Sequence, residues 1–275
     1  MAITETVLEM HYHRPMMELI RETYGLGPVG KFNFYKYSPQ HEVYLGFDQA
    51  FAMTELSDDE FFAQMRQSAM NAGYKLPSRF VAYFLQYKVV TKLQRRHAQT
   101  PSTITSKPHY RARLNTTKND RTGFSQHELL FNLHLNDGAM VYYACPMIFD
   151  KAALYEVNVN WDSLCLINLA SCPGHFRDNS KHYIYFDQKT ADPIWCSEPV
   201  DGKARTPKQF AEQVVAQLRQ FTPAASAEKL SALLGSIKSL VKSENALPGT
   251  ADSGLALFAD SLTIVQVEES TSEAS

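Results

Sequence analysis

The chain has 275 residues, 44% hydrophobic and 20% charged, with a formal net charge of −2, which is typical of a globular protein and argues against a disordered or strongly basic chain. No apolar run reaches the ~18 residues that span a bilayer, and no secretory signal is visible. The four cysteines are too irregularly spaced for a disulfide framework, so we expect a cytoplasmic protein without membrane contact.

The apolar spacing predicts helices and strands in alternation. Pro15 in a first turn and Gly25 after a last turn are typical of a helix between them. Residues 80–90, FVAYFLQYKVV, are apolar on both alternating faces, which predicts a central strand covered on both sides. Up to residue 145 we expect a helix over 14–24, strands over 31–37 and 42–53, a helix over 57–72, strands over 80–90 and 110–114, a helix from 125 to 137 and a strand over 140–145.

The rest of the chain predicts short strands followed by helices. The expected elements are strands over 165–169 and 183–187, helices beginning near 206 and 226, and a last strand within 254–267. This order predicts an α/β fold in which a mixed sheet is flanked by helices, with a C-terminal helical portion. We expect an α/β core over residues 1–200, helices packed on it over 201–245, and an acidic, partly disordered tail over 246–275.

Positive charge is concentrated in the middle of the chain. Eight Lys and Arg residues lie between Lys92 and Arg121 against the single acid Asp120, and no Lys or Arg follows Lys242. Such a segment is most often solvated surface, but this one contains Tyr110 and small hydroxyl residues suited to phosphate contacts. It therefore favours binding of a polyanion. The residues expected to contact nucleic acid are Lys92, Arg95, Arg96, Arg111 and Arg113.

Three polar residues interrupt apolar strands. Asp48 lies in YLGFDQAF, where a carboxylate is costly to bury without a partner, and Gln86 and Lys88 lie two apart, hence on one strand face. If the two strands are neighbours, Asp48 is the natural partner of Lys88. Asp48 and the amide oxygen of Gln86 suit Mg²⁺, and Lys88 suits stabilisation of the negative transition state of phosphodiester hydrolysis. A structural ion pair of Asp48 and Lys88 is the competing interpretation.

A helix, a strand pair ending in an acid, and a strand ending in Gln-x-Lys together resemble the core of the PD-(D/E)xK restriction-endonuclease-like superfamily. The form Asp48…Gln86-x-Lys88 is similar to the QxK variant of Mrr-type restriction endonucleases. The helix that opens with Gln126 resembles the one that supplies an extra polar residue in several such nucleases. Phe47 stands where a proline precedes the acid in the superfamily pattern.

The resemblance implies a restriction-endonuclease-like fold and a Mg²⁺-dependent nuclease in which Asp48, Gln86 and Lys88 carry the superfamily roles. Because Gln86 is neutral, the metal site needs a further acid, for which Glu22 is the candidate and Glu18 and Glu42 are alternatives. Gln126 is expected to contact nucleic acid. DNA is favoured over RNA as substrate, with restriction or anti-phage defence as the biological setting. Cutting of both strands favours a homodimer.

Two other classes of function stay open. In the first, the fold is catalytically inactive and serves as a nucleic-acid- or protein-binding module, with Asp48 and Lys88 as a structural pair. In the second, zinc stabilises an interaction protein. Zinc sites usually contain two close-spaced ligand pairs, and only one such pair is present, so buried thiols and loop histidines are the favoured interpretation. The residues concerned are Cys165, Cys172, His175, His182 and Cys196.

Overall fold

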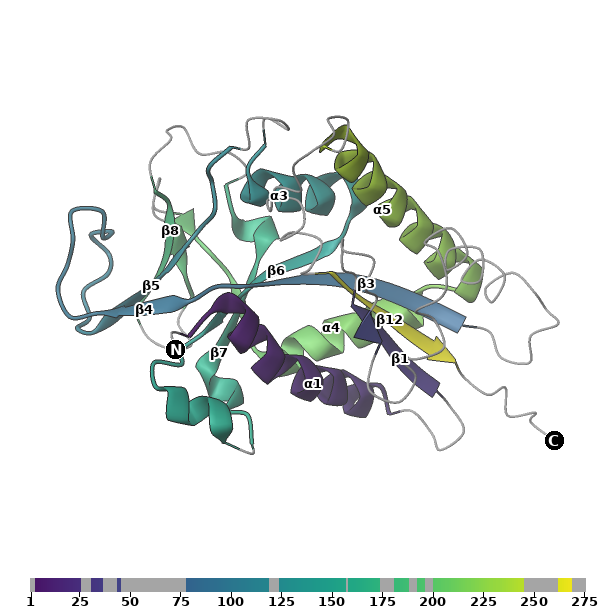
Figure 1. The fold of residues 1–275 in the computed structure, drawn as a ribbon, viewed down its shortest axis with the longest axis horizontal. Helices are drawn as coiled ribbons and strands as arrows, with labels where there is room; N and C mark the ends of the chain where they lie inside the picture. The colour runs from purple at the N-terminus through teal and green to yellow at the C-terminus, as the bar shows by residue number, and fades with distance from the viewer. Residues whose placement is uncertain are drawn as a thin grey trace. The chain divides into compact units, whose positions relative to one another are not determined.

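The computed structural model describes residues 3–25, 31–36, 44–45, 78–118, 124–156, 158–173, 181–187, 192–195, 200–244 and 262–268. Within these ranges the chain forms four α-helices and a set of strands, so the expected mixed α/β class is confirmed (Figure 1). The chain divides into two compact units. The first comprises Met1–Met17 and Leu85–Phe210, and the second comprises Glu18–Phe84 and Ala211–Ser275.

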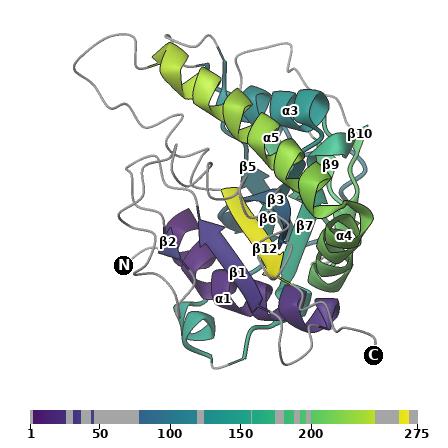
Figure 2. The ribbon, with the colours of Figure 1, turned by 90° about the vertical axis from the view of Figure 1, so that its right-hand side faces the viewer.

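The second unit contains an antiparallel group of strands in the order β2–β1–β12–β3. Figure 2 shows β12 between β1 and β3, where Val265 pairs with Phe34 on one side and with Val81 on the other. The strands are β1 (Lys31–Lys36), β2 (Tyr44–Leu45), β3 (Ser78–Tyr87, of which 78–84 belong to this unit) and β12 (Leu262–Glu268).

Strand β12 contains residues 262–267 of the last strand expected within 254–267. It lies within the range that the sequence suggested as a tail, yet side chains 262–267 are all buried. The segment LTIVQV is mostly apolar on both alternating faces, which suits a strand flanked on both edges. An early segment and a late segment of the chain therefore build one unit, and its boundaries differ from those expected from composition.

The first unit contains two groups of antiparallel strands, in the orders β6–β7–β11 and β10–β9–β8–β5–β4. Strands β4 and β5 form a hairpin whose connecting loop projects from the rest of this unit (Figure 1). The strands are β4 (Val90–Leu93), β5 (His109–Arg113), β6 (Met140–Pro146), β7 (Leu164–Asn168), β8 (Tyr183–Phe186), β9 (Ile194–Trp195), β10 (Val200–Asp201) and β11 (Ala204–Arg205). Short 3₁₀ helices cover Lys151–Tyr155, Trp161–Ser163 and Leu169–Ser171.

Helix α1 (Glu5–Tyr24) begins well before the predicted start at residue 14, and Pro15 lies inside it instead of in its first turn. An interior proline costs ~3 kcal/mol, because it removes one backbone hydrogen bond. Five large side chains spaced by four residues form a buried stripe, and each contributes about 1.5–3 kcal/mol, so the helix continues through Pro15. The stripe consists of Leu8, Tyr12, Met16, Ile20 and Tyr24.

The helix starts predicted from capping residues at Ser125 and Thr206 are confirmed, and the helix predicted over 57–72 lies outside the described residues. In α3 (Gln126–Asp137) the Ser125 hydroxyl accepts from the Glu128 N–H, and the Glu128 carboxylate accepts from the Ser125 N–H. Gly138 ends this helix with φ 61°, a left-handed conformation that glycine adopts without strain. The remaining helices are α4 (Pro207–Gln220), capped by Thr206 and Gln209, and α5 (Pro223–Glu244), which Thr222 caps and which begins three residues before the expected start near 226. None of the helices in the described ranges has the length and apolar character needed to cross a bilayer.

Candidate active site

Lys88 is buried in the first unit, directly after the end of β3. Its backbone N–H donates to the carbonyl oxygen of Ala144 on β6 at 2.8 Å, which fixes the chain at this point. The residue is 3% exposed. A buried ammonium group is stable only with a counter-charge and hydrogen-bond acceptors. The groups around Lys88 therefore determine whether its charged side chain is stable in the interior.

Two side chains bind the ammonium group. Lys88 Nζ lies 3.3 Å from Oε1 of Glu5, with which it forms an ion pair, and it donates to Oε1 of Gln126 at 3.4 Å. The ring of Tyr143 lies on another side, with its centroid 5.9 Å from Nζ, which adds a cation–π contact. The charge of Lys88 is therefore compensated within the first unit.

Gln86 joins the same network through Gln126. Gln126 Nε2 donates to Gln86 Oε1 at 3.1 Å, while Gln86 Nε2 lies 3.4 Å from the carbonyl oxygen of Tyr87. The expectation that Gln86 and Lys88 lie on one side of the strand is confirmed, since both contact the same amide group. We call Glu5, Gln86, Lys88 and Gln126 the lysine–amide cluster.

Three elements of the first unit hold the cluster together. Glu5 is the first residue of α1, Gln86 lies at the end of β3 with Lys88 directly after that strand, and Gln126 is the first residue of α3. The capping box of α3 fixes the backbone next to Gln126, so the local sequence that starts the helix also positions the amide.

A second set of buried polar groups lies beside the cluster. His127 Nε2 is 3.1 Å from the carbonyl oxygen of Pro173, and His127 Nδ1 is 2.8 Å from the Tyr143 hydroxyl. Since a carbonyl only accepts, Nε2 carries a proton, and in the neutral form of the ring Tyr143 donates to Nδ1. Burial, reinforced by the neighbouring thiols of Cys172 and Cys145, raises the pKa of Tyr143, so the phenol stays protonated. These contacts orient the ring that faces Lys88.

Neither of the acids proposed from the sequence for the metal site, Asp48 and Glu22, is among the described residues of the lysine–amide cluster. Asp48 lies outside the described residues, so its place relative to Gln86 and Lys88 stays a prediction. Glu22 is exposed on α1, in the second unit. Glu5 was not foreseen, because the helix was expected to begin at residue 14. The i, i+4 spacing of Leu8, Tyr12 and Met16 is the pattern that extends the helix back toward Glu5.

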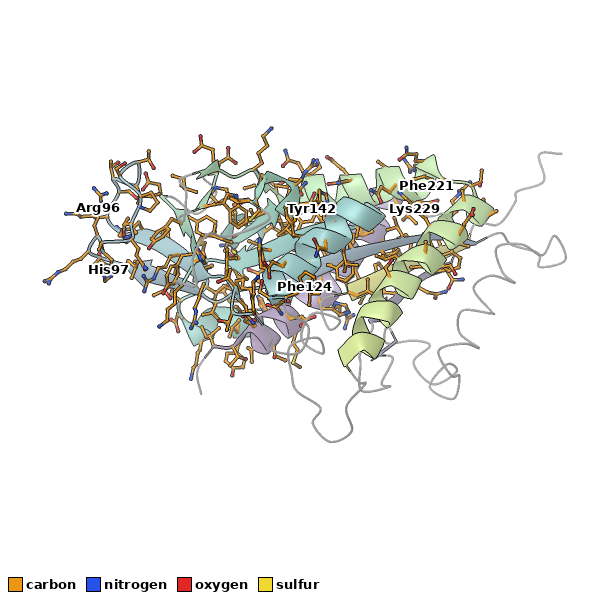
Figure 3. All side chains as sticks on the ribbon, turned by 90° about the horizontal axis from the view of Figure 1, so that it is seen from above. Arg96, His97, Phe124, Tyr142, Phe221 and Lys229 are labelled. Carbon is orange, nitrogen blue, oxygen red and sulfur yellow. The ribbon has the colours of Figure 1, made fainter. Side chains whose placement is uncertain are left out.

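The predicted nucleic-acid-binding residues fall into two groups. Lys92, Arg95, Arg96 and Arg113 are exposed and Arg111 is half-buried, all on the β4–β5 hairpin or its loop. Figure 3 shows Arg96 next to His97 on that loop. Gln126 is buried and bonded within the lysine–amide cluster instead of presenting its amide at the surface.

The cysteines described are free and buried. Cys145 and Cys165 face each other across β6 and β7. Burial raises the pKa of Cys165 to about 12 and also raises the pKa of Cys145 and Cys172, so these thiols are protonated. Among the described residues no three His, Cys, Asp or Glu side chains form a group that could hold a metal ion. His175 and Cys196 lie outside those ranges, so the zinc interpretation stays a prediction.

The cluster contains oxygen atoms of the kind that Mg²⁺ prefers as ligands, namely the carboxylate of Glu5 and the amide oxygens of Gln86 and Gln126. One oxygen of each of these side chains already accepts a hydrogen bond within the cluster. Comparison with protein-family models, with curated proteins and with solved structures finds no match to this chain. The functional argument therefore depends on the residues themselves.

Proposed function

We propose that the protein is a Mg²⁺-dependent nuclease that hydrolyses phosphodiester bonds of DNA and has a restriction-endonuclease-like core. The observation that carries the proposal is the buried Lys88, held at the end of β3 by the Glu5 carboxylate and linked to Gln86 through Gln126. Burial of a lysine is costly, and the contacts of Lys88 with Glu5, Gln126 and the Tyr143 ring offset that cost. This arrangement suits a preorganised charge in a reaction that develops negative charge.

Each residue of the cluster has a role in the proposal. Lys88 stabilises the charge that develops on the phosphate, and its hydrogen bonds to Glu5 and Gln126 keep the ammonium group in place. Asp48, Gln86 and Glu5 would hold the metal, with Glu5 as the further acid in place of Glu22. When bound, Mg²⁺ would supply activation of a water molecule and neutralisation of phosphate charge. Gln126 positions both Gln86 and Lys88.

A catalytically inactive nucleic-acid- or protein-binding module is the second candidate, and one observation favours it. The hydrogen bonds of the cluster are made within the cluster: Gln86 Oε1 already accepts from Gln126, and Lys88 is already paired with Glu5. Such an arrangement suits a structural ion pair as well as a catalytic centre. The two candidates differ in whether bound DNA is cut.

Cleavage of supercoiled plasmid and of linear duplex DNA by the purified chain separates these candidates. We expect cutting in Mg²⁺ that stops when EDTA is added, retention of activity in Gln86→Glu, because a carboxylate oxygen replaces the amide oxygen, and loss in Gln86→Leu. Binding of DNA without cutting in Mg²⁺ or Mn²⁺ would favour the binding module. Equal activity in EDTA and Mg²⁺ would contradict the metal-dependent mechanism.

A further inference from the structure

We infer that the β4–β5 hairpin of the first unit binds a single-stranded segment of nucleic acid, with a base stacked on Phe149 and phosphates contacted by the surrounding cations. The inference rests on the proposed function for the class of partner, which is nucleic acid. It adds that the bound nucleic acid is single-stranded and that the hairpin is the surface that binds it. The residues that carry it are Lys92, Tyr110 and Phe149 on one face and Arg111 and Tyr183 on the other.

The hairpin is strongly positive. Residues 92–113 include Lys92, Arg95, Arg96, Lys107, Arg111 and Arg113, and no Asp or Glu. Asp187 is an acid that contacts the loop. Its carboxylate accepts hydrogen bonds from the backbone N–H of Ser106 at 3.2 Å and from the Ser106 hydroxyl at 2.7 Å. That carboxylate is therefore engaged in shaping the loop. A projecting element with this charge complements the phosphate backbone of a nucleic acid.

An aromatic platform lies on one face of the hairpin. Tyr110 and Phe149 are stacked, with ring centroids 5.4 Å apart and ring planes 17° from parallel, and Phe149 remains 41% exposed. Lys92 pairs with Tyr110 across the strands and places Nζ 5.9 Å from the Phe149 centroid. An exposed ring beside a cation is the combination that stacks an unpaired base while contacting its phosphate.

The opposite face carries a second cation on an aromatic ring. Arg111 lies over Tyr183 with its guanidinium carbon 4.4 Å from the ring centroid, and Thr91 stands opposite Arg111 on β4. Stacking uses the face of the guanidinium group and leaves the N–H groups at its edge able to donate to phosphate oxygens. Both faces of the hairpin therefore hold a cation against an aromatic side chain.

The platform favours a single strand over a duplex. In duplex DNA the base faces are stacked on one another, so an exposed side-chain ring gains nothing from them, whereas an unpaired base has a free face. Phosphate contacts are available in both forms. A duplex bound through phosphates alone is the other outcome that the experiment distinguishes.

Fluorescence anisotropy in EDTA measures this binding without cleavage, using a labelled 20-nucleotide single strand and the matching duplex. We expect Phe149→Ala to weaken single-strand binding about tenfold and duplex binding less than about twofold. Lys92→Gln should lower the slope of log Kd against log salt by about 0.7 for the single strand. The matched control is Tyr155→Ala, since Tyr155 is 84% exposed in the same unit and should leave binding unchanged.

Three results would overturn the inference: no single-strand binding by wild type, unchanged binding by Phe149→Ala, or equal losses for single strand and duplex. Phe149→Leu, which keeps apolar volume but lacks a ring, serves if Phe149→Ala does not fold, and it should also weaken single-strand binding. Failure of the proposed function is distinguishable, because a protein that binds single strands in EDTA but never cuts in Mg²⁺ supports the hairpin and contradicts the nuclease.

Discussion

The ammonium group of Lys88 lies 3.3 Å from a carboxylate oxygen of Glu5, although 83 residues separate the two in the chain. The Lys88 side chain is 4% exposed and that of Glu5 is 43% exposed, so the carboxylate connects a buried cation to solvent. Because a buried cation needs a counter-charge, the first turn of α1 is part of the candidate site and not a dispensable end.

Replacing Glu5 should destabilise the protein through Lys88. We expect Glu5→Gln to lower the free energy of unfolding by about 1–2 kcal/mol, less than for a fully buried pair because Glu5 is partly solvated. Urea unfolding measures this change. The control is Glu22→Gln on the same helix, expected to change the value by less than about 0.5 kcal/mol. Equal effects of the two substitutions would show that Lys88 does not depend on Glu5.

The two glutamines should behave as a coupled pair. Gln86→Leu and Gln126→Leu each leave a buried amide without its partner, which costs about 1–3 kcal/mol, whereas the double variant removes both partners. We therefore expect the double variant to be less destabilised than the sum of the single variants, by about 0.5–3 kcal/mol in a double-mutant cycle. Strict additivity would mean that the bond between Gln126 Nε2 and Gln86 Oε1 contributes nothing.

Local features of the fold were predictable from the sequence. Ser125 and Glu128 form the predicted capping box, and Gln86 and Lys88 meet at one amide, because capping and strand alternation depend on residues close in sequence. Glu5 was missed for a local reason as well. Pro15 is the usual sign of a first turn, and the burial of a stripe beginning at Leu8 outweighs that sign.

Long-range pairing was not predictable in the same way. Nothing near residues 262–268 indicates that they lie between β1 and β3, since that placement depends on strands that are distant in the chain. The excess of acids after Lys242 favoured a tail, but the acids lie around the apolar segment LTIVQV and not within it. Charge averaged over thirty residues therefore suggested a tail, although the apolar run itself predicted the last strand within 254–267.

Deleting that strand should be far more damaging than deleting the residues after it. We expect removal of residues 262–275 to abolish cooperative unfolding of the second unit, because β1 and β3 lose the strand that pairs with both. Removal of residues 269–275 should leave the thermal transition unchanged. Circular dichroism with temperature follows both variants, and equal transitions in the two would contradict the central position of β12.

His109 should make stability depend on pH. The side chain is fully buried, and neither ring nitrogen has a hydrogen-bond partner in the part of the chain that the structure describes. Burial lowers the pKa of His109 below 6.5. The positive charges of the nearby His97, Arg96 and Arg111 also lower this pKa, whereas Asp187 raises it. The unfolded state therefore binds more protons between the two pKa values, and stability falls as the pH drops below about 6.5.

Replacing His109 by phenylalanine isolates its contribution to the pH dependence of stability. His109→Phe keeps the ring stacked on Tyr185 and removes the group that titrates, so the decline of Tm between about pH 7.5 and pH 5.5 should become shallower. The Tm near pH 7.5 should be equal or higher, because two buried nitrogens that have no partner among the described residues are removed. Part of the decline should remain, since burial also lowers the pKa of His13. Identical pH profiles would contradict the account.

Cleavage of supercoiled plasmid in Mg²⁺ by Lys88→Met tests the central claim most directly. Methionine fills a similar volume without charge, and the Glu5 carboxylate that loses its partner is 43% exposed and can be solvated, so the variant separates catalysis from stability more cleanly than Lys88→Ala. Lys208→Met, at an exposed position on α4, is the control. We predict that Lys88→Met remains folded and that its cleavage rate falls about 100-fold or more, as for loss of a preorganised charge. Cleavage by folded Lys88→Met at the wild-type rate would contradict the assignment of Lys88 to the reaction.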